Sequence, residues 1–98
     1  MTREIDLLVN DQPIELDYFV QNFIDHIIGG ILAGLEGVRE IERVAIYVEG
    51  DKVTVNLNNA MLPINPFVSK IIRNTIAGMV SSLKGVGEIS KVNITIKR

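Results

Sequence analysis

The sequence predicts an α+β fold of two layers, with four strands beneath two helices. The first observation behind this prediction is an internal repeat: the 98-residue chain matches itself without gaps at an offset of 48 residues, so that residues 37–46 return as residues 85–94. The second is that each copy reads as strand, helix, strand, because segments with alternating apolar residues flank a longer segment with helical spacing. We therefore expect a single domain over residues 1–98, built from unit one (3–50) and unit two (51–98).

The first strand of each unit is predicted by period-2 alternation. Apolar Ile5, Leu7 and Val9 alternate with polar or exposed positions, and Val53, Val55 and Leu57 do the same 48 residues later. A strand with this pattern has one face toward a core and one toward solvent.

The helices are predicted between matched start and stop signals. Asp17 is a candidate N-cap for the first helix, and Asn65 followed by Pro66 is one for the second. Gly37 and Gly85 are the expected stops. Apolar residues at i, i+3 and i+4 spacing predict broad core-facing stripes: Phe19, Val20, Phe23, Ile24, Ile27, Ile28, Ile31, Leu32 and Leu35 in one helix, and Phe67, Val68, Ile71, Ile72, Ile76, Met79, Val80 and Leu83 in the other.

The closing strands are expected at Ile41–Val48 and Ile89–Ile96, and Glu49-Gly50-Asp51 joins the units through a hairpin. Their inward residues are Val44, Ile46, Val48, Val92, Ile94 and Ile96. Right-handed crossovers leave a gap of one strand in each unit, which we expect the first strand of the other unit to fill. The predicted fold is a ferredoxin-like βαββαβ two-layer sandwich, with side-by-side βαβ units as the alternative.

Composition excludes several function classes. With 12 acidic and 10 basic residues the net charge is −2, which lacks the basic surface that nucleic-acid binding needs. The absence of Cys removes disulfides, thiolate nucleophiles and Cys-ligated metals. No membrane span or secretion signal is evident, so we expect a cytoplasmic protein without a metal or other cofactor.

Catalytic residues are not identifiable from the sequence. His26 is the only histidine, and its helical neighbours Asn22 and Gly30 offer no carboxylate, so we interpret it as a surface residue. We expect that the chain is not an enzyme. The remaining enzymatic hypothesis is a site formed between subunits, with His26, Tyr47 or Asp6 completed by a neighbouring chain.

The outer face of the predicted sheet is the leading candidate for function. It is expected to present small, neutral or semi-apolar residues where Lys and Glu would be usual: Asp6, Leu8, Ala45, Tyr47, Thr54, Asn56, Asn93 and Thr95. We predict that this face is covered in a homo-oligomer, with a dimer favoured, or by a protein partner, and that the interface residues are Leu8, Tyr47, Thr54, Asn56, Asn93 and Thr95.

Small residues in the helices suggest a second contact. Gly inside a helix is unfavourable, so Gly29, Gly30, Ala33 and Gly34, with Gly78 in the second helix, predict that another backbone approaches closely. Packing between the two helices of one chain is the first interpretation, and contact across a dimer is the second. Opposite net charges of the units, −7 for residues 1–50 and +5 for residues 51–98, could support pairing within or between chains.

A ligand-binding regulatory domain is the alternative function. The loop before the second helix contains Asn58, Asn59 and Asn65, and it leads to a helix N-terminus that could attract an anion or a small molecule. Helix capping and turn formation are the competing explanation for these Asn residues.

Overall fold

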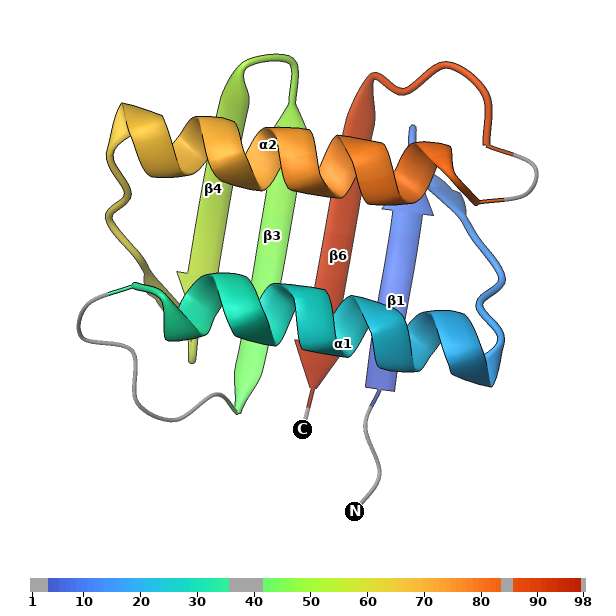
Figure 1. Cartoon of the computed structure of the whole chain (residues 1–98), viewed down its shortest axis with the longest axis horizontal. Helices are drawn as coiled ribbons and strands as arrows, with labels where there is room; N and C mark the ends of the chain where they lie inside the picture. Colours follow the sequence, from blue (N-terminus) through green and yellow to red (C-terminus); the bar gives the residue numbers. More distant parts are fainter. Residues whose placement is uncertain (1–3, 36–41, 84–85, 98) are drawn as a thin grey trace.

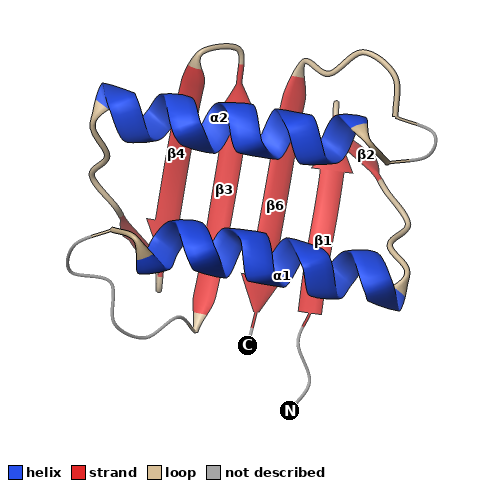
Figure 2. Cartoon of the chain, in the orientation of Figure 1, coloured by secondary structure: helices blue, strands red, loops and turns tan. Residues whose placement is uncertain are grey.

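The computed structural model describes residues 4–35, 42–83 and 86–97. Its elements in chain order are β1 (Glu4–Val9), β2 (Gln12–Pro13), α1 (Tyr18–Ala33), β3 (Arg43–Glu49), β4 (Lys52–Leu57), β5 (Ala60–Met61), α2 (Pro66–Ser81) and β6 (Lys91–Lys97). They form an α+β fold in which both helices cover the same face of a six-stranded antiparallel sheet (Figures 1 and 2). The other face of the sheet is open. The molecule is thin, with extents of 36 × 34 × 19 Å.

Corresponding elements of the two halves begin 48 residues apart. β1 and β4 begin at residues 4 and 52, α1 and α2 at 18 and 66, and β3 and β6 at 43 and 91. In the pairing of β3 with β6, Ile46 lies opposite Ile94, the residue 48 positions later. The two halves are consequently related by an approximate twofold axis that passes through this pair, perpendicular to the sheet (Figure 1).

The strand order differs from the ferredoxin-like expectation. The sheet has the order β2-β1-β6-β3-β4-β5, so the closing strands β3 and β6 lie at its centre. We expected the first strand of each unit, β1 and β4, in the centre. The gap between β1 and β3 is filled instead by β6, the last strand of the other half.

The hairpin strand β4 pairs with the outer side of β3, which leaves the gap between β1 and β3 open for β6. The hand of the crossovers is a second difference from the expectation. With the helices toward the viewer and β1 pointing up, α1 carries the chain to the left before β3 begins, which makes the crossover left-handed (Figure 1). The second crossover has the same hand. About 98% of such connections are right-handed because the helix packs back along the strands. Here both helices run across the strands, so the packing that enforces the usual hand is absent (Figure 1).

Side-chain caps define both helix starts, as predicted. The Asp17 carboxylate accepts a hydrogen bond of 2.8 Å from the Val20 amide, and the Asn65 side chain accepts one of 2.8 Å from the Val68 amide. The helices end at Ala33 and Ser81, before the predicted stops. Gly37 and Gly85 lie outside the described residues.

The core lies between the sheet and the helices. The predicted inward residues of β3 and β6 are buried, as are alternate residues of β1. Each helix buries one narrow apolar row at i, i+4 and i+8, all at most 1% exposed: Ile24, Ile28 and Leu32 in α1, and Ile72, Ile76 and Val80 in α2. Asp25, which follows the first of these in α1, is also buried. The broad stripes predicted for the core were wrong at their outer edges, because Phe19, Phe23, Phe67 and Ile71 are exposed.

Candidate functional site

The open face of the sheet carries two parallel rows of side chains that run across four strands. Their order follows from the strand register: one row is Leu8, Asn93, Tyr47 and Thr54, and the other is Asp6, Thr95, Ala45 and Asn56. All eight residues predicted for this face are therefore brought together. Asp6 is the one charged residue among them.

A shallow hollow of about 510 Å³ lies on this face. Ala45 lies in its lining beside the ring of Tyr47, which is 43% exposed. Asn56, Asn59 and Thr95 contribute neutral polar side chains to the same lining, and its charged residues are Glu4, Asp6, Arg43 and Lys97. The hollow can therefore receive a ring-sized group and offer it hydrogen-bond partners.

Apart from Asp6, the charged side chains of the open face lie at the ends of the strands. At one end Glu4, Lys97 and Arg43 are neighbours across β1, β6 and β3. At the other end the Lys91 ammonium lies 3.3 Å from the Asp11 carboxylate and 3.8 Å from that of Glu49. These pairs are exposed and stabilise the chain only weakly, but they place charge at the rim and leave Asp6 as the one charged residue of the two central rows.

Both edges of the sheet end in two-residue strands that the sequence analysis missed. β2 and β5 pair with β1 and β4 through turns at Asn10-Asp11 and Asn58-Asn59. All four turn residues have positive φ, between 51° and 67°, which is the backbone of a type I′ hairpin turn. The Asn-rich dipeptides were the signal for these hairpins.

The Asn residues predicted to bind a ligand have structural contacts. The Asn58 side-chain oxygen accepts hydrogen bonds of 2.9 and 3.1 Å from the Glu42 and Arg43 amides, which holds the start of β3. Asn65 caps α2, and Asn59 lines the hollow of the open face. The three residues therefore do not converge on the N-terminus of α2, and capping and turn formation account for Asn58 and Asn65.

The helix glycines do not mark a contact between α1 and α2. A Cβ atom at Gly30 or Gly78 would meet no atom within 4 Å, and one at Gly34 would meet only the backbone of its own helix. Close packing of the two helices within one chain was therefore the wrong interpretation of Gly30 and Gly78. Ala33 is exposed, and Gly29 is half-buried. Contact across a dimer stays a prediction.

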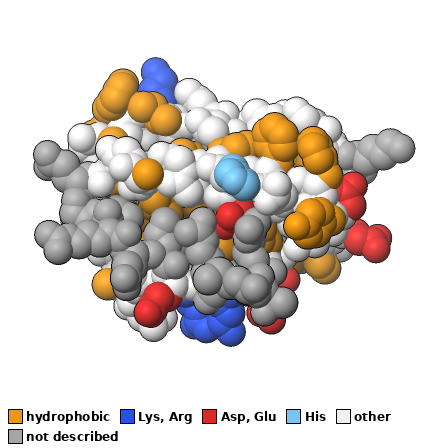
Figure 3. Space-filling view, turned by 60° about the horizontal axis from the view of Figure 1, so that its bottom comes forward, with side chains coloured by type: hydrophobic (Ala, Val, Ile, Leu, Met, Phe, Trp, Pro, Cys, Tyr) orange, Lys and Arg blue, Asp and Glu red, His pale blue; other side chains and the backbone are white. Residues whose placement is uncertain are grey.

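Exposed aromatic side chains on the helix layer were also missed. Phe19 and Phe23 are 68% and 54% exposed, and their rings lie against each other with centroids 5.4 Å apart. Figure 3 shows hydrophobic side chains at the surface beside the single histidine. The available signal was the width of the predicted stripes, because one helix face on a sheet cannot bury so many positions.

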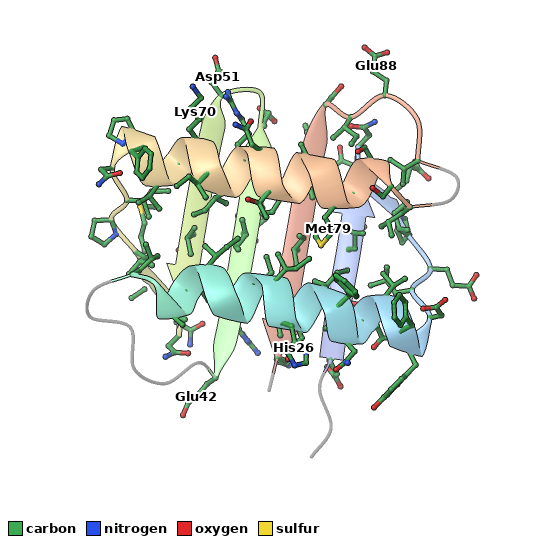
Figure 4. The ribbon with its side chains drawn as sticks, in the orientation of Figure 1. His26, Glu42, Asp51, Lys70, Met79 and Glu88 are labelled. Carbon is green, nitrogen blue, oxygen red and sulfur yellow. The ribbon has the colours of Figure 1, made fainter. Side chains whose placement is uncertain are left out.

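The titratable side chains considered for catalysis do not gather. His26 is exposed, and its Nδ1–H donates a hydrogen bond of 2.8 Å to the carbonyl of Asn22. It points away from α2, while Glu42, Asp51 and Glu88 lie at separate corners of the molecule (Figure 4). Tyr47 and Asp6 occupy different rows of the open face. Within the described ranges, no three His, Cys, Asp or Glu side chains come together as a metal site would require.

Neither described helix is long and apolar enough to cross a bilayer. No protein-family model matches the chain, and no significant match was found among curated proteins or solved structures.

Proposed function

We propose that the chain is a self-associating module that pairs with a second copy of itself through the open face of its sheet. The observation that carries the proposal is the low charge at the centre of this face, where two rows of side chains across four strands hold a single carboxylate, that of Asp6. The cores of protein interfaces are depleted in charged residues and enriched in Tyr, and their rims are polar. The rows and the charged strand ends have this arrangement.

Shape supports pairing of one face with its copy. Tyr47 stands beside Ala45 on the same strand, so the face carries a projection next to a hollow. In a face-to-face pair, the ring of the partner's Tyr47 enters the hollow of the first copy. Asn56 and Thr95 in the lining offer partners to its hydroxyl group, which a buried Tyr requires.

The edges of the sheet favour stacking of faces over pairing of edges. The outermost strands are two residues long, and Pro13 in β2 has no amide hydrogen to donate to an added strand. Short edge strands and Pro are the devices by which proteins block edge-to-edge addition. Association through the sheet therefore uses its open face.

The test is molar mass by light scattering after size-exclusion chromatography. We expect Tyr47→Lys and Leu8→Lys to lower the mass of the assembly, because each places a positive charge in the two central rows of the open face. The circular dichroism spectrum should show that the fold is retained. Glu88→Lys, in the exposed loop before β6, is the matched control and leaves the mass unchanged. An unchanged mass in both face variants contradicts the proposal.

Ionic strength separates this interface from pairing of the oppositely charged halves. A contact through the two central rows of the open face persists at high salt, because salt screens interactions between charged groups and these rows hold only one charged residue. Dissociation at high salt would favour contact between the acidic and basic halves instead.

A further inference from the structure

Each helix turns a ridge of side chains away from the sheet, and we call these two sets the outer ridges. Their members lie opposite the buried rows at helical spacing. The outer ridge of α1 is Phe19, Phe23, His26, Gly30 and Ala33, and that of α2 is Phe67, Ile71, Asn74, Gly78 and Ser81; all ten residues are exposed. They correspond pairwise at the offset of 48 residues. The ridges are thus equivalent features of the two halves.

The outer ridges contain no Asp, Glu, Lys or Arg. A helix face that is solvated normally carries such residues, because the opposite face buries the apolar ones. The chain has 22 of these charged residues in all, so their absence is particular to the ridges. Depletion of charge together with exposed Phe is the composition found at the centre of a protein interface.

The exposed apolar area of the ridges is of the size that a dimer needs. Phe19, Phe23 and Phe67 are 68%, 54% and 70% exposed, and Ile71 is 43% exposed. At about 200 Å² for a large side chain these fractions amount to roughly 450 Å². A standard interface buries about 800 Å² on each partner, of which about 56–65% is apolar. The two values agree.

The ridges also have complementary shapes. Each begins with bulky side chains and ends with small ones, Gly30 and Ala33 in α1 and Gly78 and Ser81 in α2. Because α1 and α2 run in opposite directions, the bulky half of one lies beside the small half of the other (Figure 1). A groove of about 350 Å³ separates Phe19 and Phe23 from the C-terminal half of α2, with Met79 pointing into the space between the helices (Figure 4).

This arrangement is self-complementary. A twofold axis in the plane of the helix layer, directed either along or across the helices, places the bulky halves of one copy over the small halves of the other. We infer that the outer ridges form a second self-association surface, which the helix layer of another copy covers. This pairing explains why Gly30 and Gly78 are glycines, because the absence of a side chain lets the partner's aromatic rings approach the helix backbone. Within the described residues, a Cβ atom at either position would meet no atom within 4 Å.

A second copy of the chain is a better occupant for the outer ridges than a lipid surface. Interfacial helices combine an apolar face with Lys and Arg that attract anionic lipids. The exposed residues of α1 include neither Lys nor Arg, the only Lys or Arg among those of α2 is Lys70, and Arg73 of α2 is paired with Asp51. The chain as a whole carries a net charge of −2. Weak attraction to an anionic bilayer is therefore expected.

The new surface lies on the side of the molecule opposite to the open sheet face. Two twofold axes on opposite sides of a flat body do not meet, so pairing through both surfaces generates an open stack of copies. We expect the mass of the wild-type assembly to exceed that of a dimer and to rise with protein concentration.

The test uses two ridge variants in the full chain. Phe23→Lys places a charge in the bulky half, and Gly30→Gln fills the small half with a longer side chain. Gln is the better helix former, and a Cβ atom at position 30 meets no atom of the described residues within 4 Å, so we expect this variant to keep the stability of the monomer. Glu88→Lys again serves as the control.

We expect either ridge variant to reduce the mass to that of a dimer, twice the 10.9 kDa of one chain, and to abolish its increase with concentration. Combining Phe23→Lys with Tyr47→Lys gives a monomer. If both ridge variants keep the wild-type mass, the ridge surface is overturned, whatever Tyr47→Lys does. If Phe23→Lys alone converts a dimer to a monomer and Tyr47→Lys has no effect, the ridge surface is supported and the sheet-face proposal fails. Pairing of the ridges would also be overturned if the wild type binds phosphatidylserine vesicles and Phe23→Lys abolishes this binding without changing the mass of the assembly.

Discussion

The Asn10 side chain joins the first hairpin turn to the start of β6 through hydrogen bonds. Substitution of Asn10 tests how much these hydrogen bonds contribute to the stability of the fold. The Asn10 side chain donates a hydrogen bond of 2.7 Å to the Glu88 carbonyl. Its oxygen accepts two more, of 2.7 Å from the Ser90 amide and 2.9 Å from the Lys91 amide. The backbone of Asn10 has a φ of 53°, in the left-handed region that Asn and Gly tolerate.

Two substitutions separate the hydrogen bonds from the backbone conformation. Asn10→Gly keeps the positive φ and loses three hydrogen bonds, each contributing about 0.5–1.5 kcal/mol to stability. Because these bonds are exposed to solvent, we expect a loss of about 2 kcal/mol in the free energy of unfolding. Asn10→Ala loses the same bonds and also bears the steric cost of the left-handed region, so we expect about 1 kcal/mol more.

Urea unfolding followed by circular dichroism, at one protein concentration, measures both effects. With an m-value toward the lower end of about 1–3 kcal/mol/M, Asn10→Gly lowers the midpoint by roughly 1.5 M. Asp11→Gly is the control: Asp11 has a φ of 65° and an exposed ion pair with Lys91, so its loss changes stability by about 0.5 kcal/mol or less. If Asn10→Gly unfolds at the wild-type midpoint, the hydrogen bonds do not hold β6. Equal stabilities of the Gly and Ala variants would show that the turn is not left-handed in solution.

Two further substitutions test the core and a helix cap. Ile94→Ala, at the buried pair on the pseudo-twofold axis, removes about 2–5 kcal/mol of stability, and a cost below about 1 kcal/mol in urea unfolding would contradict the central position of β6. Asn65→Ala removes the cap of α2 and lowers the free energy of unfolding by about 1 kcal/mol, whereas Asn65→Asp keeps an acceptor for the Val68 amide and retains the stability. Thermal unfolding of the two variants distinguishes them. Equal melting temperatures would exclude the cap.

Local features of the fold could be predicted from single residues. The N-caps at Asp17 and Asn65, the hairpin at Gly50 and the inward residues of β3 and β6 all follow from side-chain chemistry or strand alternation, and the structure confirms them. The dipeptides Asn10-Asp11 and Asn58-Asn59, whose residues have positive φ, are an equally local signal for the hairpins of β2 and β5.

The order of the strands could not be predicted in this way. Whether β6 or β4 fills the gap between β1 and β3 depends on the side of β3 on which β4 pairs, and both orders bury the same alternating residues. The usual right-handed rule assumes a helix that packs along the strands. The width of the helix stripes is visible in the sequence, but it does not show that the outer edges of the stripes are exposed. Phe19 and Phe67 show that periodicity locates an apolar face without stating whether the same chain or another copy covers it.

The sequence predicts which residues share the open face, but not how they are aligned on it. Alternation placed Leu8, Tyr47, Asn93 and Thr54 on one face, but their alignment in a single row required the register of β1, β6, β3 and β4. The hollow beside Tyr47 has the same origin, since Thr95 and Asn56 reach it from neighbouring strands.

The central place of β6 also sets the order in which the chain can fold. β6 is the last strand of the sheet to leave the ribosome, yet it joins β1 on one side to β3 on the other. Until it is present, β1 with β2 and β3 with β4 and β5 are separate hairpins that share no hydrogen bond. The contacts that unite them link residues as distant as Ile5 and Ile96, and such long-range contacts slow folding. A single sheet therefore cannot form before β6 has been synthesised, and a chain that stops short of Lys91 lacks the middle of its sheet.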